Sequence, residues 1–184
     1  DLESFFERLD RPVIAMGHSR GAVASLLLAV KRPDLVSALV LIDPTILPYS
    51  WMWWWYLAKM TGAARWVPIV ATAAKRRYQW PDRRTILENY RGKTVFRSWQ
   101  AEFLEAYITY GTEVLQDGGV RLCCRPAWES KAFATCSHDV WHYVNRLKQP
   151  TLLLYGDRSD TCLPATVRRF ARSVPHARIT ALER

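Results

Sequence analysis

Residues 12–42 constrain the fold more than any other part of the sequence, because they have the pattern of a strand, a helix and a second strand. The runs 13–17 and 36–42 are apolar without polar alternation, as in strands that are buried on both faces. Residues 21–31 between them have a helical pattern that Pro33 closes. Strands joined through a helix in this way lie parallel, since a tight hairpin cannot connect them. The segment therefore predicts a parallel α/β sheet.

The same pattern returns near the end of the chain. An apolar run at 151–155 precedes a helix that begins at Pro164, and residues 178–182 form a last apolar run. We expect these two runs and the first two to be parallel neighbours in one sheet. Between them, residues 47–147 show almost no strand alternation and contain a turn at 116–120. Helical stretches are expected near 50–60, 63–77, 82–90, 98–110, 126–134 and 138–147. The sequence thus predicts a core from 1–46 and 148–184, and a helical insertion over 47–147.

Ser19 lies between two glycines, after the first strand and before the first helix of the predicted sheet. The flanking positions of such a turn must be small where helix and strand approach closely, and Gly17 and Gly21 meet that need. The turn would raise the Ser19 hydroxyl at the carboxyl end of the sheet, where open α/β folds place their sites. The backbone N–H of Arg20 would lie at a helix N-terminus and could donate to an oxyanion. The alternative is a plain glycine turn with a buried serine.

These residues resemble the nucleophile elbow of the α/β-hydrolase superfamily. Residues 35–44 resemble the next core strand of that family, and 149–164 resemble the strand and loop that carry its acid. The resemblance implies a partial α/β-hydrolase fold, a parallel sheet with helices on both faces and a helical cap over 47–147. It implies Ser19 as the nucleophile and Asp160, three residues after Asp157, as the triad acid. Asp157 is then a turn residue, and the alternative for Asp160 is a carboxylate that caps the helix at Pro164.

The catalytic histidine is not evident in the sequence. In this family the triad follows the order Ser, Asp or Glu, His, so the base should come after Asp160. Only His176 does, and it precedes the last strand, at the wrong end of the sheet. His18 adjoins the nucleophile and is expected to pack beside the site. We therefore expect the histidine beyond Arg184 and the family's first strands before Asp1, so that the chain is an inactive internal fragment of a longer hydrolase.

The resemblance implies a serine hydrolase that cleaves a carboxylic ester through an acyl-enzyme, without a metal or an organic cofactor. Thioester, lactone and carbon–carbon bond hydrolysis use the same parts and stay open. Epoxide hydrolases and haloalkane dehalogenases place aspartate at the elbow, and Ser19 argues against both. The alternative from another class is a hydrolase-like protein that binds ligands without catalysis.

Two other motifs have several interpretations. Residues 51–56, WMWWWY, would be apolar all round in a helix. They predict packing of the cap on the core, an aromatic wall that selects an apolar or aromatic acyl substrate, or contact with a membrane surface. His138 and His142 have a spacing that can bind zinc, but no third ligand is evident, so no metal is expected.

The charge and the cysteine content limit which partners and which cellular compartment we expect. The net charge is +9, and residues 75–97 contain eight basic and two acidic residues. We interpret this run as a solvated helical face and expect a small-molecule acyl substrate rather than nucleic acid, because no known nucleic-acid module is present. No apolar stretch reaches about 18 residues, so no stable membrane insertion is expected. The four cysteines have no ladder-like spacing, which predicts a reducing, cytoplasmic setting.

Overall fold

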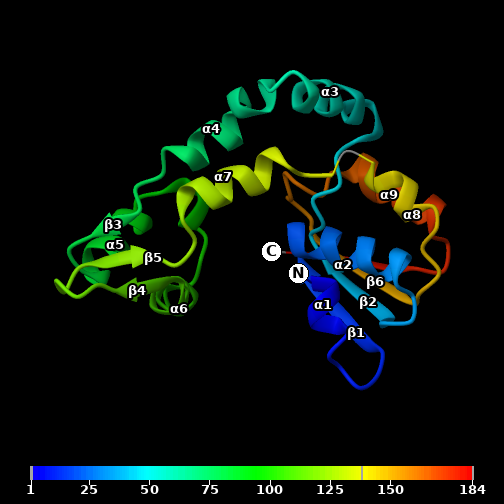
Figure 1. The fold of residues 1–184 in the computed structure, drawn as a ribbon, viewed down its shortest axis with the longest axis horizontal. Coiled ribbons are helices and arrows are strands. Elements are labelled where there is room, and N and C mark those ends of the chain that lie inside the picture. The colour runs from blue at the N-terminus through cyan, green and yellow to red at the C-terminus, as the bar shows by residue number, and fades with distance from the viewer. Residues whose placement is uncertain (1, 138, 184) are drawn as a thin grey trace. The chain divides into compact units, whose positions relative to one another are not determined.

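The computed structural model describes residues 2–137 and 139–183 (Figure 1). The chain divides into two compact units. The first contains residues 1–60 and 136–184, and the second contains 61–135. The second unit is shorter than the insertion predicted over 47–147, because the helices on either side of it group with the sheet.

The first unit is built on a four-stranded sheet. Its strands are β1 (Val13–His18), β2 (Val36–Ile42), β6 (Thr151–Gly156) and β7 (Arg178–Leu182), in the order β1-β2-β6-β7. All three neighbouring pairs are parallel. The prediction that the four apolar runs are parallel neighbours in one sheet is therefore confirmed, and the carboxyl ends of all four strands lie at one edge.

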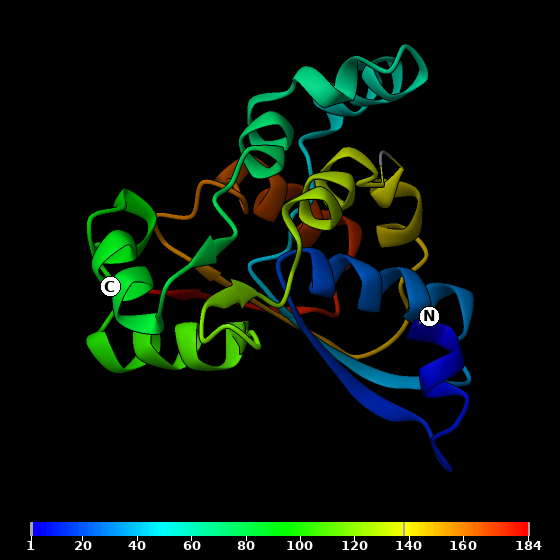
Figure 2. The same ribbon diagram turned by 60° about the vertical axis from the view of Figure 1, so that its left-hand side comes forward.

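Helices pack against one face of this sheet. They are α2 (Arg20–Lys31), α8 (Val140–Val144) and α9 (Pro164–Ser173), whose ribbons are drawn in Figure 2. Their side chains share one core with those of β1, β2 and β6. Leu26, Trp141 and Phe170 are each at most 2% exposed in this core. On the other side of β1, Ile14 and Met16 are 66% and 70% exposed. Alternate residues of a strand point to opposite faces, so these two side chains belong to the face away from the core.

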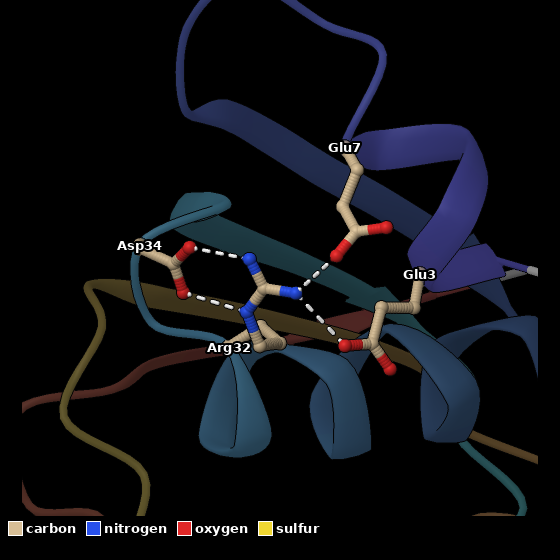
Figure 3. Close-up of polar contacts among 4 residues, drawn as sticks. All are labelled: Glu3, Glu7, Arg32 and Asp34. Atoms are coloured by element: carbon tan, nitrogen blue, oxygen red, sulfur yellow. Dashed lines mark hydrogen bonds and ion pairs between the residues drawn. The ribbon is translucent and has the colours of Figure 1, made fainter.

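Arg32 ties the first helix of the chain, α1 (Leu2–Phe6), to the end of α2. Its guanidinium donates two parallel hydrogen bonds to Asp34, of 3.0 and 2.7 Å, and also bonds Glu3 and Glu7 (Figure 3). Such a two-point contact is the geometry in which arginine binds a carboxylate best. The hydrogen bonds from Arg32 hold the pKa of Asp34 below its ordinary value, and the three carboxylates raise the pKa of Arg32.

Replacing Arg32 by glutamine is expected to raise the pKa of Asp34 toward its ordinary value. A carboxyl group whose pKa is lowered by folding stabilises the fold above its unfolded pKa, and this stabilisation is lost as the pH falls through the lowered value. The stability difference between wild type and Arg32→Gln should therefore close as the pH falls through that range. A carbon-13 NMR titration of Asp34 measures the shift, with Arg8→Gln as the control. An unchanged Asp34 pKa in Arg32→Gln would contradict this account.

The second unit combines helices with a small antiparallel sheet. The sheet consists of β3 (Gln79–Trp80), β5 (Val120–Leu122) and β4 (Thr112–Val114), in that order. The helical segments are η1 (Ala63–Trp66), α4 (Pro68–Ala74), α5 (Arg83–Arg91), η2 (Thr94–Phe96), α6 (Ala101–Gly111) and α7 (Pro126–Ala134). The sequence predicts helices and a turn here but not these strands, which are too short to show alternation. The turn is confirmed, because Gly118 has φ 83° and Leu115 N–H donates to Gly119 O at 2.7 Å.

A separate core holds this unit together. Trp80, Ile86 and Tyr90 are buried in it, and the Asp82 carboxylate caps α5 by accepting from Thr85 N–H at 2.7 Å. Elsewhere in the unit, Ser130 Oγ of α7 donates to the carbonyl of Val70 in α4 at 2.9 Å. Three of the basic side chains in 75–97 pair with carboxylates, in Arg76–Glu129, Arg84–Glu88 and Arg91–Glu105.

Candidate active site

Ser19 occupies a strained turn between β1 and α2. Its φ and ψ are 54° and −118°, and a positive φ is uncommon for a residue other than glycine. The Ser19 N–H donates to the carbonyl of Ile42, at the end of β2, at 2.8 Å. The end of the neighbouring strand therefore holds the backbone in this conformation. Strain of this kind persists only where surrounding contacts impose it, and it is frequent at functional sites.

The two glycines around Ser19 have different roles. A Cβ added to Gly17 would lie 2.4 Å from the backbone carbon of Gly21 and 2.6 Å from the nitrogen of Ala22. Gly17 is thus the residue that lets α2 approach β1. A Cβ on Gly21 would meet no described atom within 4 Å. The sequence expectation that both positions must be small therefore holds for Gly17, while Gly21 contributes only its backbone to the close approach.

The Ser19 side chain meets a partner that the sequence does not predict. Its Oγ lies 2.9 Å from Oγ1 of Thr45, and either hydroxyl can donate. Thr45 follows β2 in the chain, and the turn of Ser19 follows β1, so the parallel pairing of the two strands brings them together. Arg20 is the first residue of α2, and its N–H is one of the amide groups that the helix itself leaves without an acceptor.

Asp43 fixes the loop that carries Asp160. The Asp43 carboxylate accepts from Ser159 Oγ at 2.8 Å and from Thr161 Oγ1 at 2.6 Å, the residues on either side of Asp160. Asp43 itself has φ 45°, and its N–H donates to Leu154 O of β6 at 2.7 Å. The loop follows the carboxyl end of β6, so it lies at the same edge of the parallel sheet as Ser19.

The two candidate acids differ in their contacts. The Asp157 N–H extends the sheet by donating to Leu182 O at 3.1 Å, and its carboxylate lies 3.9 Å from Arg158. Asp160 is exposed, and within the described part of the chain its carboxylate has no hydrogen bond or ion pair. The first turn of α9 has no side-chain cap, so Asp160 does not serve as a helix cap there.

Cys162 adjoins this loop but is poorly suited to act as a nucleophile. It is 1% exposed, and burial, with a smaller effect of Asp43, raises the pKa of its thiol to about 12. The thiolate is the reactive form of cysteine. At neutral pH the thiol of Cys162 is therefore protonated and inert. Two other cysteines, Cys123 and Cys124, are exposed in the second unit.

Comparison with known proteins decides the family. The sequence model described as "Alpha/beta hydrolase family" matches residues 1–184, which is the whole chain. The chain belongs to the alpha/beta hydrolase family. The predicted superfamily and the partial α/β-hydrolase fold are thereby confirmed.

Solved hydrolases share the fold with this chain. A hydrolase from Rickettsia typhi, described as putative, has a TM-score of 0.73 at 19% identity, with 99% of this chain and 58% of that chain covered. E-2-(acetamidomethylene)succinate hydrolase has a TM-score of 0.70 at 22% identity, with 99% and 61% covered. An esterase from Mycobacterium tuberculosis has a TM-score of 0.67 at 21% identity, with 99% and 57% covered. The chain therefore spans about six tenths of the length of these structures.

A curated relative matches a shorter segment. The lipase LipV of Mycobacterium tuberculosis is 51% identical to this chain over 37 residues, which are 20% of this chain and 14% of the lipase.

No described histidine of this chain has a hydrogen bond to Ser19. His176 Nε2 lies 3.2 Å from Gln149 O, just before β6 begins, so it is at the opposite end of the sheet from Ser19. His18 is exposed at the end of β1, which differs from the expectation that it packs beside the site. His142 belongs to α8, and its ring is nearly perpendicular to that of Tyr143, with the ring centres 5.5 Å apart. His138 lies outside the described residues.

The aromatic run 51–56 forms half of α3 (Tyr49–Met60). Trp53 and Trp54 are 70% and 74% exposed, and none of the helix's side chains is buried. Met52, Trp53 and Tyr56 line a cavity of about 440 Å³ with Trp141 of α8. Its described lining does not include Ser19, so the role of the run as a substrate wall stays a prediction.

Among residues 2–137 and 139–183, no group of three or more histidine, cysteine, aspartate or glutamate side chains is placed to hold a metal ion. Within the same residues, no helix is both long and apolar enough to span a bilayer. The cytoplasmic setting stays a prediction.

Proposed function

We propose that this protein is a serine hydrolase that cleaves a carboxylic ester through an acyl-enzyme. The observation that carries the proposal is the strained Ser19 turn, held by Ile42 at the carboxyl end of the sheet in a member of the alpha/beta hydrolase family. Metal-independent ester cleavage needs a nucleophile, a base and an oxyanion donor near one another. Ser19 and the N–H of Arg20 supply the first and the last of these.

The reaction proceeds in two steps. Ser19 Oγ attacks the acyl carbon while its proton passes to a histidine, and the Arg20 N–H stabilises the oxyanion. The carbonyl re-forms as the carbon–oxygen bond to the alcohol breaks, and the alcohol takes the proton from the histidine. Water then attacks the acyl-enzyme with the same histidine as base, which releases the acid and restores Ser19. In the free protein the hydroxyl of Ser19 is hydrogen-bonded to that of Thr45. During the reaction the imidazole replaces Thr45 as the hydrogen-bond partner of Ser19.

The histidine and its orienting acid complete the proposal. We place the histidine in sequence that follows Arg184, because the family order sets it after Asp160 and none of the described histidines meets Ser19. Asp160 accepts from the second nitrogen of that imidazole and steadies the imidazolium. This role is supported by the hydrogen bonds of the Asp43 carboxylate to Ser159 and Thr161, the residues on either side of Asp160, which we call the Asp43 clamp. These bonds hold the loop and leave the Asp160 carboxylate available.

The proposed substrate has an apolar or aromatic acyl group. The support is the aromatic lining of the 440 Å³ cavity and the apolar character of α3. Similarity to an esterase and a lipase favours an ester over the thioester, lactone and carbon–carbon bond alternatives. The second candidate, a ligand-binding protein without catalysis, requires that the longer protein lack the histidine.

Covalent labelling tests the proposal. The full-length gene product that contains residues 1–184 is expected to react with a fluorophosphonate, and mass spectrometry should find the adduct on Ser19. The 184-residue chain alone should label poorly, because serine needs an adjacent base. A panel of p-nitrophenyl esters, thioesters and lactones then identifies the bond that is cleaved. A full-length protein that neither labels nor hydrolyses any of the panel would favour the binding protein instead.

A further inference from the structure

A second cavity, of about 460 Å³, opens between the start of α3 and α9 within the first unit. The side chains that matter for its chemistry are Tyr49, Ser50, Trp141, Arg169, Arg172 and Ser173. Its described lining does not include Ser19 or Asp160. It shares Tyr49 and Trp141 with the lining of the 440 Å³ cavity, whereas Arg169, Arg172 and Ser173 line this cavity and not that one.

Arg169 is held in a fixed position in this cavity. Its guanidinium carbon lies 4.2 Å from the centre of the Tyr49 ring and 4.9 Å from that of Trp141. Trp141 is 2% exposed, and its indole N–H donates to Leu47 O at 2.9 Å, so the ring under the guanidinium is itself anchored. Stacking on aromatic rings holds the planar guanidinium in place while its edge stays available for hydrogen bonds.

The positive charge in the cavity is not balanced. The Nε of Arg169 is buried and has no acceptor in the described part of the chain. A buried donor of this kind is costly unless an acceptor reaches it. Arg172 lines the same cavity one helical turn later, and within the described residues its Nε donates to the carbonyl of Arg168 alone, at 3.3 Å. The described lining contains no aspartate or glutamate.

We propose that this cavity binds the oxyanion group, a phosphate or a carboxylate, of a small molecule. Guanidinium groups match both anions through paired N–H donors. The hydroxyls of Ser50 and Ser173 line the cavity as further donors, and the rings of Tyr49 and Trp141 supply an apolar wall for the rest of the molecule. The proposal is independent of the catalytic role of Ser19.

Isothermal titration calorimetry with inorganic phosphate and with benzoate tests the proposal, against sodium chloride at matched ionic strength. We expect at least one of the two anions to bind, and the one that binds identifies the oxyanion. Arg169→Met keeps an apolar stem between the rings but removes the guanidinium, and should weaken binding about tenfold or more. Arg168→Gln is the matched control, because Arg168 is the exposed neighbour on the same helix and does not line the cavity. It should change the affinity by less than about twofold.

Two further variants distinguish loss of the binding site from loss of the fold and from an effect of the catalytic serine. If near-UV circular dichroism shows that Arg169→Met is perturbed, Arg172→Gln, at an exposed position, should still weaken binding severalfold. Ser19→Ala should bind the anion as the wild type does. The proposal is overturned if neither anion binds, if Arg168→Gln weakens binding as much as Arg169→Met, or if Ser19→Ala abolishes it.

Discussion

Replacing Ser19 by alanine is expected to lower kcat for a p-nitrophenyl ester by about four to six orders of magnitude in the full-length protein. The acyl-enzyme cannot form without the Ser19 oxygen, so only substrate binding and oxyanion stabilisation would contribute to the residual rate. KM should change little, because the hydroxyl contributes little to ground-state binding. Steady-state kinetics, with active-site titration by a fluorophosphonate, measure both effects.

Thr45→Val is the matched control for this variant. It removes the hydroxyl that meets Ser19 Oγ at 2.9 Å and leaves the nucleophile in place. Its kcat should stay within about tenfold of the wild type, the effect of one neutral hydrogen bond. If Ser19→Ala retains most of the activity while circular dichroism shows an intact fold, Ser19 is not the nucleophile.

Replacing Gly17 by alanine is expected to destabilise the protein by about 3 kcal/mol or more, because the added methyl group meets backbone rather than a movable side chain. The atoms 2.4–2.6 Å from the new Cβ belong to Gly21 and Ala22, so the start of α2 must shift away from β1. This shift also moves the turn of Ser19, and catalysis should fall together with stability. Urea unfolding followed by far-UV circular dichroism measures the free energy of unfolding.

Gly21→Ala, at the other end of the same turn, is expected not to lower the free energy of unfolding. Its Cβ meets nothing described within 4 Å, and the residue lies in the first turn of α2. Alanine favours helix over glycine, so this variant should be neutral or more stable by up to about 1 kcal/mol. Equal losses in the two variants would contradict the different roles assigned to the glycines.

The sequence was informative where local pattern alone determines structure. The four apolar runs predict the sheet, because runs without regular polar alternation are typical of strands in parallel α/β sheets. The Gly17–Ser19 turn is also visible in the sequence, because the glycines around Ser19 mark it, although the carbonyl of Ile42 in the neighbouring strand holds its backbone. The confirmed turn at 116–120 belongs to the same class, because the Asp117-Gly118 pair favours a tight connection.

Contacts between distant segments escaped prediction. Asp43 and its partners Ser159 and Thr161 are separated by 116 and 118 residues, and Thr45 meets Ser19 across 26. Each of these residues looks like an ordinary polar loop residue in the sequence. Only the pairing of β2 with both β1 and β6 brings them together, and register between strands is a property of the folded sheet.

The hydrogen bonds of Asp43 to Ser159 and Thr161 also affect which parts of such a chain can change in evolution. The two segments that it joins are neighbours through the sheet, because β2 pairs directly with β6, and not through the residues between them along the chain. The whole of 61–135 is inserted between these strands and has a hydrophobic core of its own. Recombination or lengthening within that insertion would leave the Asp43 contacts with Ser159 and Thr161 unchanged. A lineage could therefore exchange the insertion without re-evolving the placement of Asp160 or the cavities of the first unit.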